Sequence, residues 1–293
     1  MDWRSTHRNL DESSPNDTTF PRSVSISDMA IETPNESPVL YEVRDRVALI
    51  TLNRPSALNA LTPEMGDHYV TRLREADADP NVRVAVVTGA GRGFCAGADV
   101  GLLAQGPEAL DAFSVGDNMS ALPTLISTLS IPVVAAVNGP AAGVGFVLPL
   151  AADVRVAAPT ATFASMFSRL GLIAEYGCAW LLPRIVGPAR ASELLLSGRS
   201  VSADEALAIG LVTSVSDDVV ATAMDWANNV AAHCSPKSLR AIKAQLLEGQ
   251  SQTFSEAGAQ SLIGMRESFR WPDLLAALAG RAEKRSPNFP PLD

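Results

Sequence analysis

The feature that most constrains the fold is an apolar stretch that is broken once, by a cluster of turn residues. Ile131–Val137 is an unbroken apolar run of strand length, and it stops at Asn138–Pro140. The next segment, Ala141–Ala152, is small and apolar with Gly143 and Gly145 near its start, which predicts that a buried helix begins there. Because the first amides of a helix lack partners within it, a strand, a glycine turn and a helix start can together bind negative charge.

A second stretch of the same kind lies upstream, in Val84–Val100. An apolar β-branched run again meets a glycine-rich turn, and Cys95–Asp99 then leads towards Leu102 and Leu103. Two such strand ends can each offer a backbone N–H to one oxygen. Glycines at these positions can also mean only close packing of the backbone, so the pattern by itself leaves both interpretations open.

The composition favours some classes of protein over others. The 293 residues are 47% hydrophobic, enough for a large core without disulfide bonds. The formal charge is −9 and no basic cluster stands out, so we expect neither nucleic acid nor a membrane as a partner. Three cysteines and three histidines without ligand spacing predict no metal site and no disulfide framework. A cytoplasmic setting fits best, and we expect no signal peptide or membrane-spanning segment.

The order of elements predicts an α/β fold. Residues 1–37 are rich in Ser, Thr, Pro, Asn and Asp, which is typical of a mobile extension. Val39–Arg44 and Arg46–Asn53 read as an antiparallel pair of strands, and a capped helix follows from Thr62 to about Asp77. Arg83–Thr88 is the next strand, so the order is that of a strand–helix–strand core.

The remainder of the chain is predicted to be mostly helical. Gly106–Leu129 and the long segment Asp217–Arg285 read as helical regions. Between them we expect strands at Val154–Ala157 and Ala161–Ser165, a loop at Gly171–Gly177 leading into a helix that ends near Pro183, and helices at Pro188–Leu196 and Ala203–Ile209. We therefore divide the chain into an extension (1–37), a core (38–215) and a C-terminal helical region (216–293).

Four long motifs occur in this core. They are ITLNRPSALNALT at Ile50–Thr62, VTGAGRGFCAGAD at Val87–Asp99, PVVAAVNGPAAGVG at Pro132–Gly145 and LLPRIVGPARASELLLSGR at Leu181–Arg199. In order and spacing they resemble the enoyl-CoA hydratase/isomerase (crotonase) superfamily, over a region from about Val39 to Leu292. The resemblance implies a spiral of ββα units that binds an acyl-CoA thioester. It also implies a C-terminal helical region that forms a homotrimer or a dimer of trimers. Coenzyme A would be part of the substrate, with no tightly bound cofactor.

The resemblance also implies an oxyanion hole. Its two donors would be the N–H groups of Ala98 and Val144, which would hold the thioester oxygen as negative charge develops on it; losing one such donor typically costs about 3 kcal/mol. Arg54 would lie near the coenzyme A phosphates. The residues expected to contact the substrate are Arg54, Ala57, Leu58, Ala96, Gly97, Ala98, Asp99, Gly143, Val147 and Phe167.

The sequence departs from the family pattern at the acid–base residues. The two glutamates of the family's hydratases are replaced by Val147 and Phe167, neither of which can carry a proton. General base catalysis is worth roughly 10²–10⁴-fold, so this change argues against two-glutamate hydration. Glu175 matches the position of a proton-shuttling carboxylate in some family isomerases, and burial beside these apolar residues would raise its pKa. Alternatively, Glu175 only interacts with the dipole of the following helix.

Three hypotheses follow for the function. The first is an enoyl-CoA isomerase that uses Glu175, the second is a hydratase that uses Glu175 alone, and the third is a catalytically silent acyl-CoA binder. We expect Asp99 to orient its loop through backbone hydrogen bonds and Asp153 to be structural. Cys95 and Cys178 have no histidine nearby in the sequence and are interpreted as packing residues.

Overall fold

The computed structural model describes residues 37–106 and 125–292. Apart from Ser37, the predicted extension lies outside the described residues, as does most of the predicted helical region Gly106–Leu129. The chain begins its main sheet with a hairpin of β1 (Val39–Arg44) and β2 (Val47–Leu52), as predicted. The two turn residues, Asp45 and Arg46, have φ of 48° and 69°, the left-handed pair that a tight hairpin requires.

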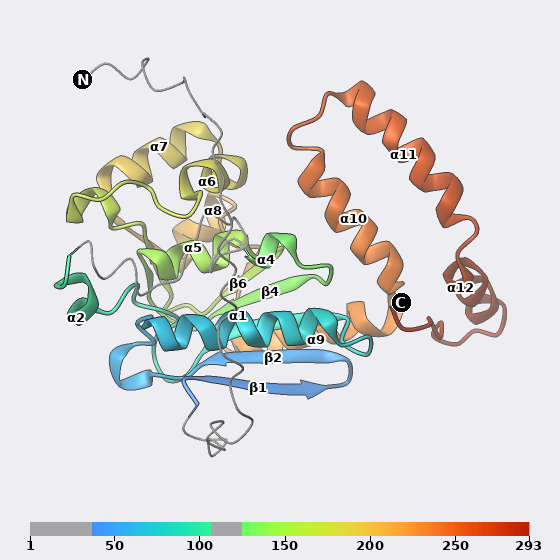
Figure 1. The fold of residues 1–293 in the computed structure, drawn as a ribbon, viewed down its shortest axis with the longest axis horizontal. Coiled ribbons are helices and arrows are strands. Elements are labelled where there is room, and N and C mark those ends of the chain that lie inside the picture. Colours follow the sequence, from blue (N-terminus) through green and yellow to red (C-terminus); the bar gives the residue numbers. More distant parts are fainter. Residues whose placement is uncertain (1–36, 107–124, 293) are drawn as a thin grey trace, which may run out of the picture. The chain divides into compact units, whose positions relative to one another are not determined.

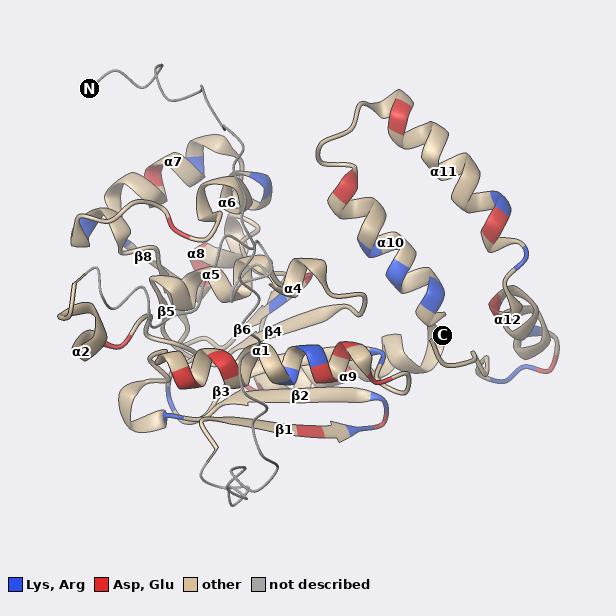
Figure 2. Ribbon diagram, viewed as in Figure 1, with Lys and Arg blue, Asp and Glu red and all other residues tan. Residues whose placement is uncertain are grey.

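The main sheet has six strands in the order β1-β2-β3-β4-β6-β9, and all pairs after the hairpin are parallel (Figure 1). The bounds are Val84–Gly89 for β3, Val133–Val137 for β4, Val154–Ala157 for β6 and Ser214–Val215 for β9. Every residue of β3 and β4 is buried, and Figure 2 shows no charged residue on either strand. This is the pattern of parallel strands that are covered on both faces.

Two helices cover the two faces of this sheet. In β3, Ala85 packs into the cluster that contains α1 (Pro63–Ala78), whereas Val86 packs into the cluster that contains α9 (Val219–His233). The alternation follows from the two-residue period of a strand. The predicted helix start is confirmed, because the Thr62 hydroxyl accepts a hydrogen bond from the N–H of Met65 (3.2 Å).

A second, smaller sheet includes the short strand that lies within the second glycine turn. It has three strands in the order β5-β7-β8, with bounds Ala141–Ala142, Thr162–Ala164 and Ser200–Ser202. The predicted buried helix is confirmed as α5 (Val144–Ala151), but it begins three residues after Ala141, following β5 and the N-cap Gly143, and all of its residues are buried. The strands β5, β8 and β9 were not predicted because segments of two or three residues carry no periodicity.

The other helices of six or more residues agree with the prediction except at one end, and of the short pieces only Leu125–Thr128 lies in a region predicted to be helical. Their bounds are Cys178–Val186 for α6, Pro188–Ser197 for α7, Ala203–Ala208 for α8, Pro236–Glu248 for α10, Phe254–Ser268 for α11 and Pro272–Ala282 for α12, with short pieces at Pro55–Ala57 (η2), Val100–Leu103 (α2), Leu125–Thr128 (α4) and Phe167–Leu170 (η3). The predicted end of α6 near Pro183 was wrong. The helix tolerates this proline and ends at Gly187, whose φ is 80°.

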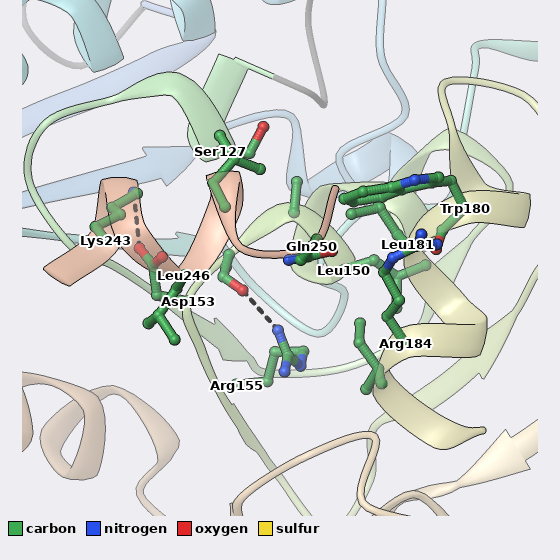
Figure 3. Close-up of a pocket in the computed structure, with 14 residues that line it drawn as sticks. Ser127, Leu150, Asp153, Arg155, Trp180, Leu181, Arg184, Lys243, Leu246 and Gln250 are labelled. Atoms are coloured by element: carbon green, nitrogen blue, oxygen red, sulfur yellow. Dashed lines mark hydrogen bonds and ion pairs between the residues drawn. The ribbon is translucent and has the colours of Figure 1, made fainter. Parts of the chain in front are cut away.

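Lys243 connects α10 to the core. Its buried ammonium donates hydrogen bonds to the carbonyl oxygens of Ile126 and Ile131 (2.9 Å each) and to Asp153 Oδ2 (2.8 Å; Figure 3). Asp153 Oδ2 also accepts from the N–H of Val133 at the start of β4 (2.7 Å). Asp153 is therefore structural, as predicted from the sequence.

We expect Lys243→Met to lower the free energy of unfolding by about 2 kcal/mol, because it removes charged hydrogen bonds while keeping the apolar stem. Chemical denaturation measures this loss. In a double-mutant cycle with Asp153→Asn, the two losses should be less than additive, since both changes break the same ion pair. If the two losses in the free energy of unfolding were fully additive, the interaction between Lys243 and Asp153 would contribute nothing to stability.

Candidate active site

The two glycine-rich turns are in direct backbone contact. Gly97 has φ of 105°, and a Cβ atom placed on it would lie 2.9 Å from the carbonyl oxygen of Ala142. A Cβ atom on Gly143 would lie 3.8 Å from the Cα of Gly97. The sequence predicted that both turns contribute to one site, and the structure brings them together at these glycines.

Pairing with the preceding loop leaves the amide of Ala98 free. The N–H of Leu61 donates to the carbonyl of Gly97 (2.8 Å), and the N–H of Asp99 donates to the carbonyl of Leu61 (2.9 Å). Ala98 lies between these two bonds in a parallel bridge, so its own N–H points away from Leu61. Within residues 37–106 and 125–292, this N–H has no hydrogen-bond acceptor.

The amide of Val144 is free for a different reason. Val144 is the first residue of α5, and the first N–H groups of a helix have no acceptor within the helix. No acceptor for it occurs elsewhere in the described chain. The preceding residue, Gly143, donates instead to the carbonyl of Ala164 in β7 (3.0 Å), which fixes the start of the helix.

One residue after Val144, the backbone of α5 packs closely against the first glycine turn. A Cβ atom on Gly145 would lie 2.1 Å from the carbonyl oxygen of Cys95 and 2.8 Å from its sulfur. Burial raises the pKa of the Cys95 thiol to about 12, and it does the same for Cys178. Both thiols are thus protonated at neutral pH and serve as packing groups, in agreement with the sequence-based interpretation.

Two asparagines that the sequence analysis did not identify as site residues tie the turns together. Asn138 Nδ2 donates to the carbonyls of Gly89 (2.8 Å) and Gly91 (2.9 Å), while its Oδ1 accepts from the N–H of Gly89 (3.1 Å). Asn59 is fully buried and donates to the carbonyl of Gly93 (2.8 Å). The available signal was that each asparagine lies beside a turn, where its side chain can replace backbone partners.

Glu175 lies in the loop before α6, outside the first turn of that helix. Its carbonyl accepts from the N–H of Cys178 (2.9 Å), and the intervening Tyr176 and Gly177 are both left-handed, with φ of 49° and 73°. The carboxylate is partly buried, and this burial raises its pKa, in the predicted direction. In the described part of the chain the carboxylate makes no hydrogen bond or ion pair, so no protein group there competes with a proton for its oxygens.

The two positions that the family resemblance assigns to the glutamates of hydratases are apolar and buried. Val147 in α5 has no exposed surface, and Phe167 at the start of η3 is 3% exposed. Both belong to the larger hydrophobic cluster of the core. Neither side chain can accept a proton or orient water by hydrogen bonding.

The loop that contains Arg54 lies along the first glycine turn. After η2, Leu58 is left-handed, with φ of 50°, and its carbonyl accepts from the N–H of Ala96 (3.0 Å). The guanidinium of Arg54 donates to the carbonyl of Ala60 and to Asp99 Oδ2 (3.2 Å). Asp99 Oδ1 accepts from the N–H of Gly101 (3.0 Å), so Asp99 orients its loop as predicted.

The pocket in Figure 3 is separate from these turns. It encloses about 200 Å³ and is lined by Leu150, Arg155, Trp180 and Arg184, together with Lys243. It adjoins the C-terminal end of α5, and a helix of this length spans about 12 Å, so the free amide of Val144 lies at the opposite end. None of the residues predicted to bind substrate lines this pocket.

The described residues were also searched for a metal site and for a membrane-spanning helix. Among them, no group of three or more His, Cys, Asp or Glu side chains is arranged to hold a metal ion. None of the helices in the described ranges has the length and apolar character needed to cross a membrane.

Comparisons with known proteins bear on the family to which the chain belongs. A family model described as "Enoyl-CoA hydratase/isomerase" matches residues 42–290. The chain is 37% identical to the 1,2-epoxyphenylacetyl-CoA isomerase of Escherichia coli K12, over 86% of this chain and 97% of the relative. It is 43% identical to the "Probable enoyl-CoA hydratase echA14" of Mycobacterium tuberculosis CDC 1551, over 67% of this chain and 76% of the relative.

Solved structures show the same architecture. The fold matches an enoyl-CoA hydratase from Polaromonas sp. JS666 with a TM-score of 0.79 and 33% identity, over 86% of this chain and 99% of that one. A probable enoyl-CoA hydratase/isomerase from Mycobacterium abscessus matches with the same TM-score, at 32% identity over 87% and 99%. With a sequence family that covers most of the chain and a shared α/β fold, the protein belongs to the enoyl-CoA hydratase/isomerase family of the crotonase superfamily.

Proposed function

We propose that this family member is an enoyl-CoA isomerase that moves a double bond in an acyl-CoA thioester, with Glu175 carrying the proton. The proposal rests on one contrast: Glu175 is a partly buried carboxylate with a raised pKa, whereas Val147 and Phe167 are apolar. Glu175 can take and return a proton, whereas Val147 and Phe167 cannot. The Escherichia coli relative named as an isomerase supports this choice.

In the proposed reaction the free amides of Ala98 and Val144 bind the thioester oxygen. The Glu175 carboxylate removes a proton from carbon 2 of a 3-enoyl thioester, and the electron pair moves to the thioester oxygen to give a dienolate. The two amides stabilise this negative charge. Glu175, now protonated, returns the proton to carbon 4, which leaves a conjugated 2-enoyl thioester and regenerates the carboxylate.

The absorbance of the conjugated enoyl thioester tests the proposal. With purified protein, a 3-enoyl-CoA substrate should gain this absorbance, while a 2-enoyl-CoA substrate should lose little of it. Loss of conjugation from the 2-enoyl substrate would instead show hydration with Glu175 alone, the reaction in the name of the Mycobacterium tuberculosis relative. Saturable acyl-CoA binding without either change would show a silent binder. No binding of any acyl-CoA would contradict all three hypotheses.

The raised pKa of Glu175 predicts the pH dependence of the free enzyme. The reaction needs the carboxylate, so kcat/KM should rise with pH as Glu175 loses its proton, and fall below its pKa. Because burial favours the protonated form, the midpoint of this rise should lie above the value of an exposed glutamate. A pH profile of kcat/KM from pH 4 to 8 measures the midpoint. A midpoint at or below the value of an exposed glutamate would contradict Glu175 as the base.

We also propose that the core is built as the family's spiral of ββα units and that the C-terminal region, 216–293, assembles the chain into a homotrimer or a dimer of trimers. Large apolar side chains on α10, α11 and α12 support this proposal, since they are exposed in the single chain: Leu246 is 68% exposed, Phe254 94%, Phe269 70% and Leu275 71%. Exposed apolar side chains in such numbers are typical of subunit interfaces. Light scattering after size-exclusion chromatography gives the mass of the assembly, and a monomer would contradict it.

A further inference from the structure

We propose that Arg54 acts on the reaction through Asp99, by neutralising the carboxylate that follows the oxyanion amide of Ala98. Arg54 is then a positioning residue, and its contribution does not depend on the phosphates of coenzyme A. This inference rests on the proposed function, because it assumes that the amide of Ala98 faces a developing negative charge. It is separate from the expectation, implied by the family resemblance, that Arg54 lies near those phosphates.

The contacts of Arg54 lie within its own loop and at the end of the first glycine turn. Its guanidinium donates to the carbonyl of Ala60 and lies 3.2 Å from Asp99 Oδ2, and its own N–H donates to Asn59 Oδ1 (2.8 Å). Asn59 in turn donates to the carbonyl of Gly93. The side chains of Arg54 and Asp99 are 30% and 29% exposed, so water screens this pair only in part.

The second oxygen of the Asp99 carboxylate also accepts a hydrogen bond. Oδ1 accepts from the N–H of Gly101 and caps α2, so both oxygens of the carboxylate have partners, one residue along the chain from the amide of Ala98. An unpaired negative charge at this position would repel the negative charge that the amide stabilises, because like charges at close range oppose each other. The guanidinium cancels that repulsion while the cap remains in place.

Bound acetoacetyl-CoA provides a readout that does not need turnover. Its conjugated enolate absorbs at a longer wavelength than its keto form, so the pH at which the bound ligand ionises reports how well the site stabilises negative charge on oxygen. In Arg54→Met this midpoint should rise by about one pH unit, a ten-fold loss of enolate stabilisation. The double variant Arg54→Met/Asp99→Asn should return the midpoint towards the wild-type value, since neither charge remains.

Control variants separate this role from a structural one and from phosphate binding. Asp99→Asn alone should lower the midpoint, because Arg54 is then an unopposed positive charge, and Arg54→Lys should retain most of the wild-type behaviour. Arg92→Met, in the neighbouring glycine turn, removes an exposed arginine and should have no effect. The effect of Arg54→Met should be equal for acetoacetyl-CoA and for acetoacetyl-pantetheine, which lacks the nucleotide and its phosphates.

The possible failures are distinguishable. If the double variant stays as impaired as Arg54→Met, or if the defect occurs only with the coenzyme A ligand, this inference is wrong while the proposed function stands. If the wild-type protein binds acetoacetyl-CoA without any enolate absorbance, or does not bind it, the oxyanion site itself is wrong. That result would overturn the proposed function and this inference together.

Discussion

Replacing Glu175 with glutamine should lower kcat for the isomerisation by roughly 10²–10⁴-fold, the usual contribution of a positioned acid–base group. Glutamine has nearly the same shape, but it cannot take a proton from carbon 2. The thioester would still be held by the backbone amides, so the dissociation constant for acyl-CoA should remain nearly unchanged. Stopped-flow absorbance with a 3-enoyl-CoA gives kcat, and isothermal titration calorimetry gives the dissociation constant.

The stability of this variant provides a second, independent readout. The pKa of Glu175 is higher in the folded protein than in the unfolded chain, because burial disfavours the charge. Its ionisation therefore lowers stability as pH rises above the unfolded pKa, so Glu175→Gln should be at least as stable as the wild type at neutral pH. Glu64→Gln, in the exposed first turn of α1, is the matched control: it should leave the rate unchanged and lower stability by less than about 1 kcal/mol, through the lost interaction with the helix dipole. A Glu175→Gln variant that keeps full turnover would rule out this residue as the base.

Gly145→Ala should lower the free energy of unfolding by about 3 kcal/mol or more, because the added methyl group has no space. It would lie 2.1 Å from the carbonyl oxygen of Cys95, and a backbone oxygen cannot move aside as a flexible side chain can. The strain must displace the start of α5 and with it the amide of Val144. Turnover by the folded fraction should therefore fall by about 10²-fold or more, the usual cost of a lost oxyanion donor.

Gly258→Ala is the control for the same chemical change. Gly258 lies inside α11, and a Cβ atom there would have nothing within 4 Å. Alanine should stabilise this helix by about 0.5–1 kcal/mol through its higher helix propensity. Thermal or urea denaturation measures both variants. If Gly145→Ala unfolded at the wild-type midpoint with full activity, the close contact between the two turns would not constrain the site.

The sequence was most informative where residue type leaves little choice of conformation. The apolar runs of β3 and β4 and the cap at Thr62 predicted their elements within one or two residues, because burial on both faces and a capped helix start leave strong patterns. The apolar runs that end in glycine-rich segments identified both glycine turns. The contact between Gly97 and Ala142 could not be derived from the residues alone, since it depends on how two separate segments meet in space.

The sequence was least informative about polar side chains that bind the backbone across long distances. Nothing in the local pattern showed that Asn138 holds the turn at Gly89, or that Arg54 reaches Asp99, because these partners lie more than forty positions apart. Short strands such as β8 were likewise missed, since their pairing is determined by the neighbouring strand. These contacts arise only after the core has formed.

The closed surroundings of Val147 and Phe167 restrict which activities this chain can acquire by gradual sequence change. A glutamate at Val147 would place an ionisable group where the side chain has no exposed surface at all, and an unpaired buried charge is costly to folding. A glutamate at Phe167 would also leave part of the volume of a phenyl ring empty. Intermediate sequences on a route to a two-glutamate hydratase would therefore fold poorly, unless other substitutions first made space and polar partners for the new carboxylates in the core.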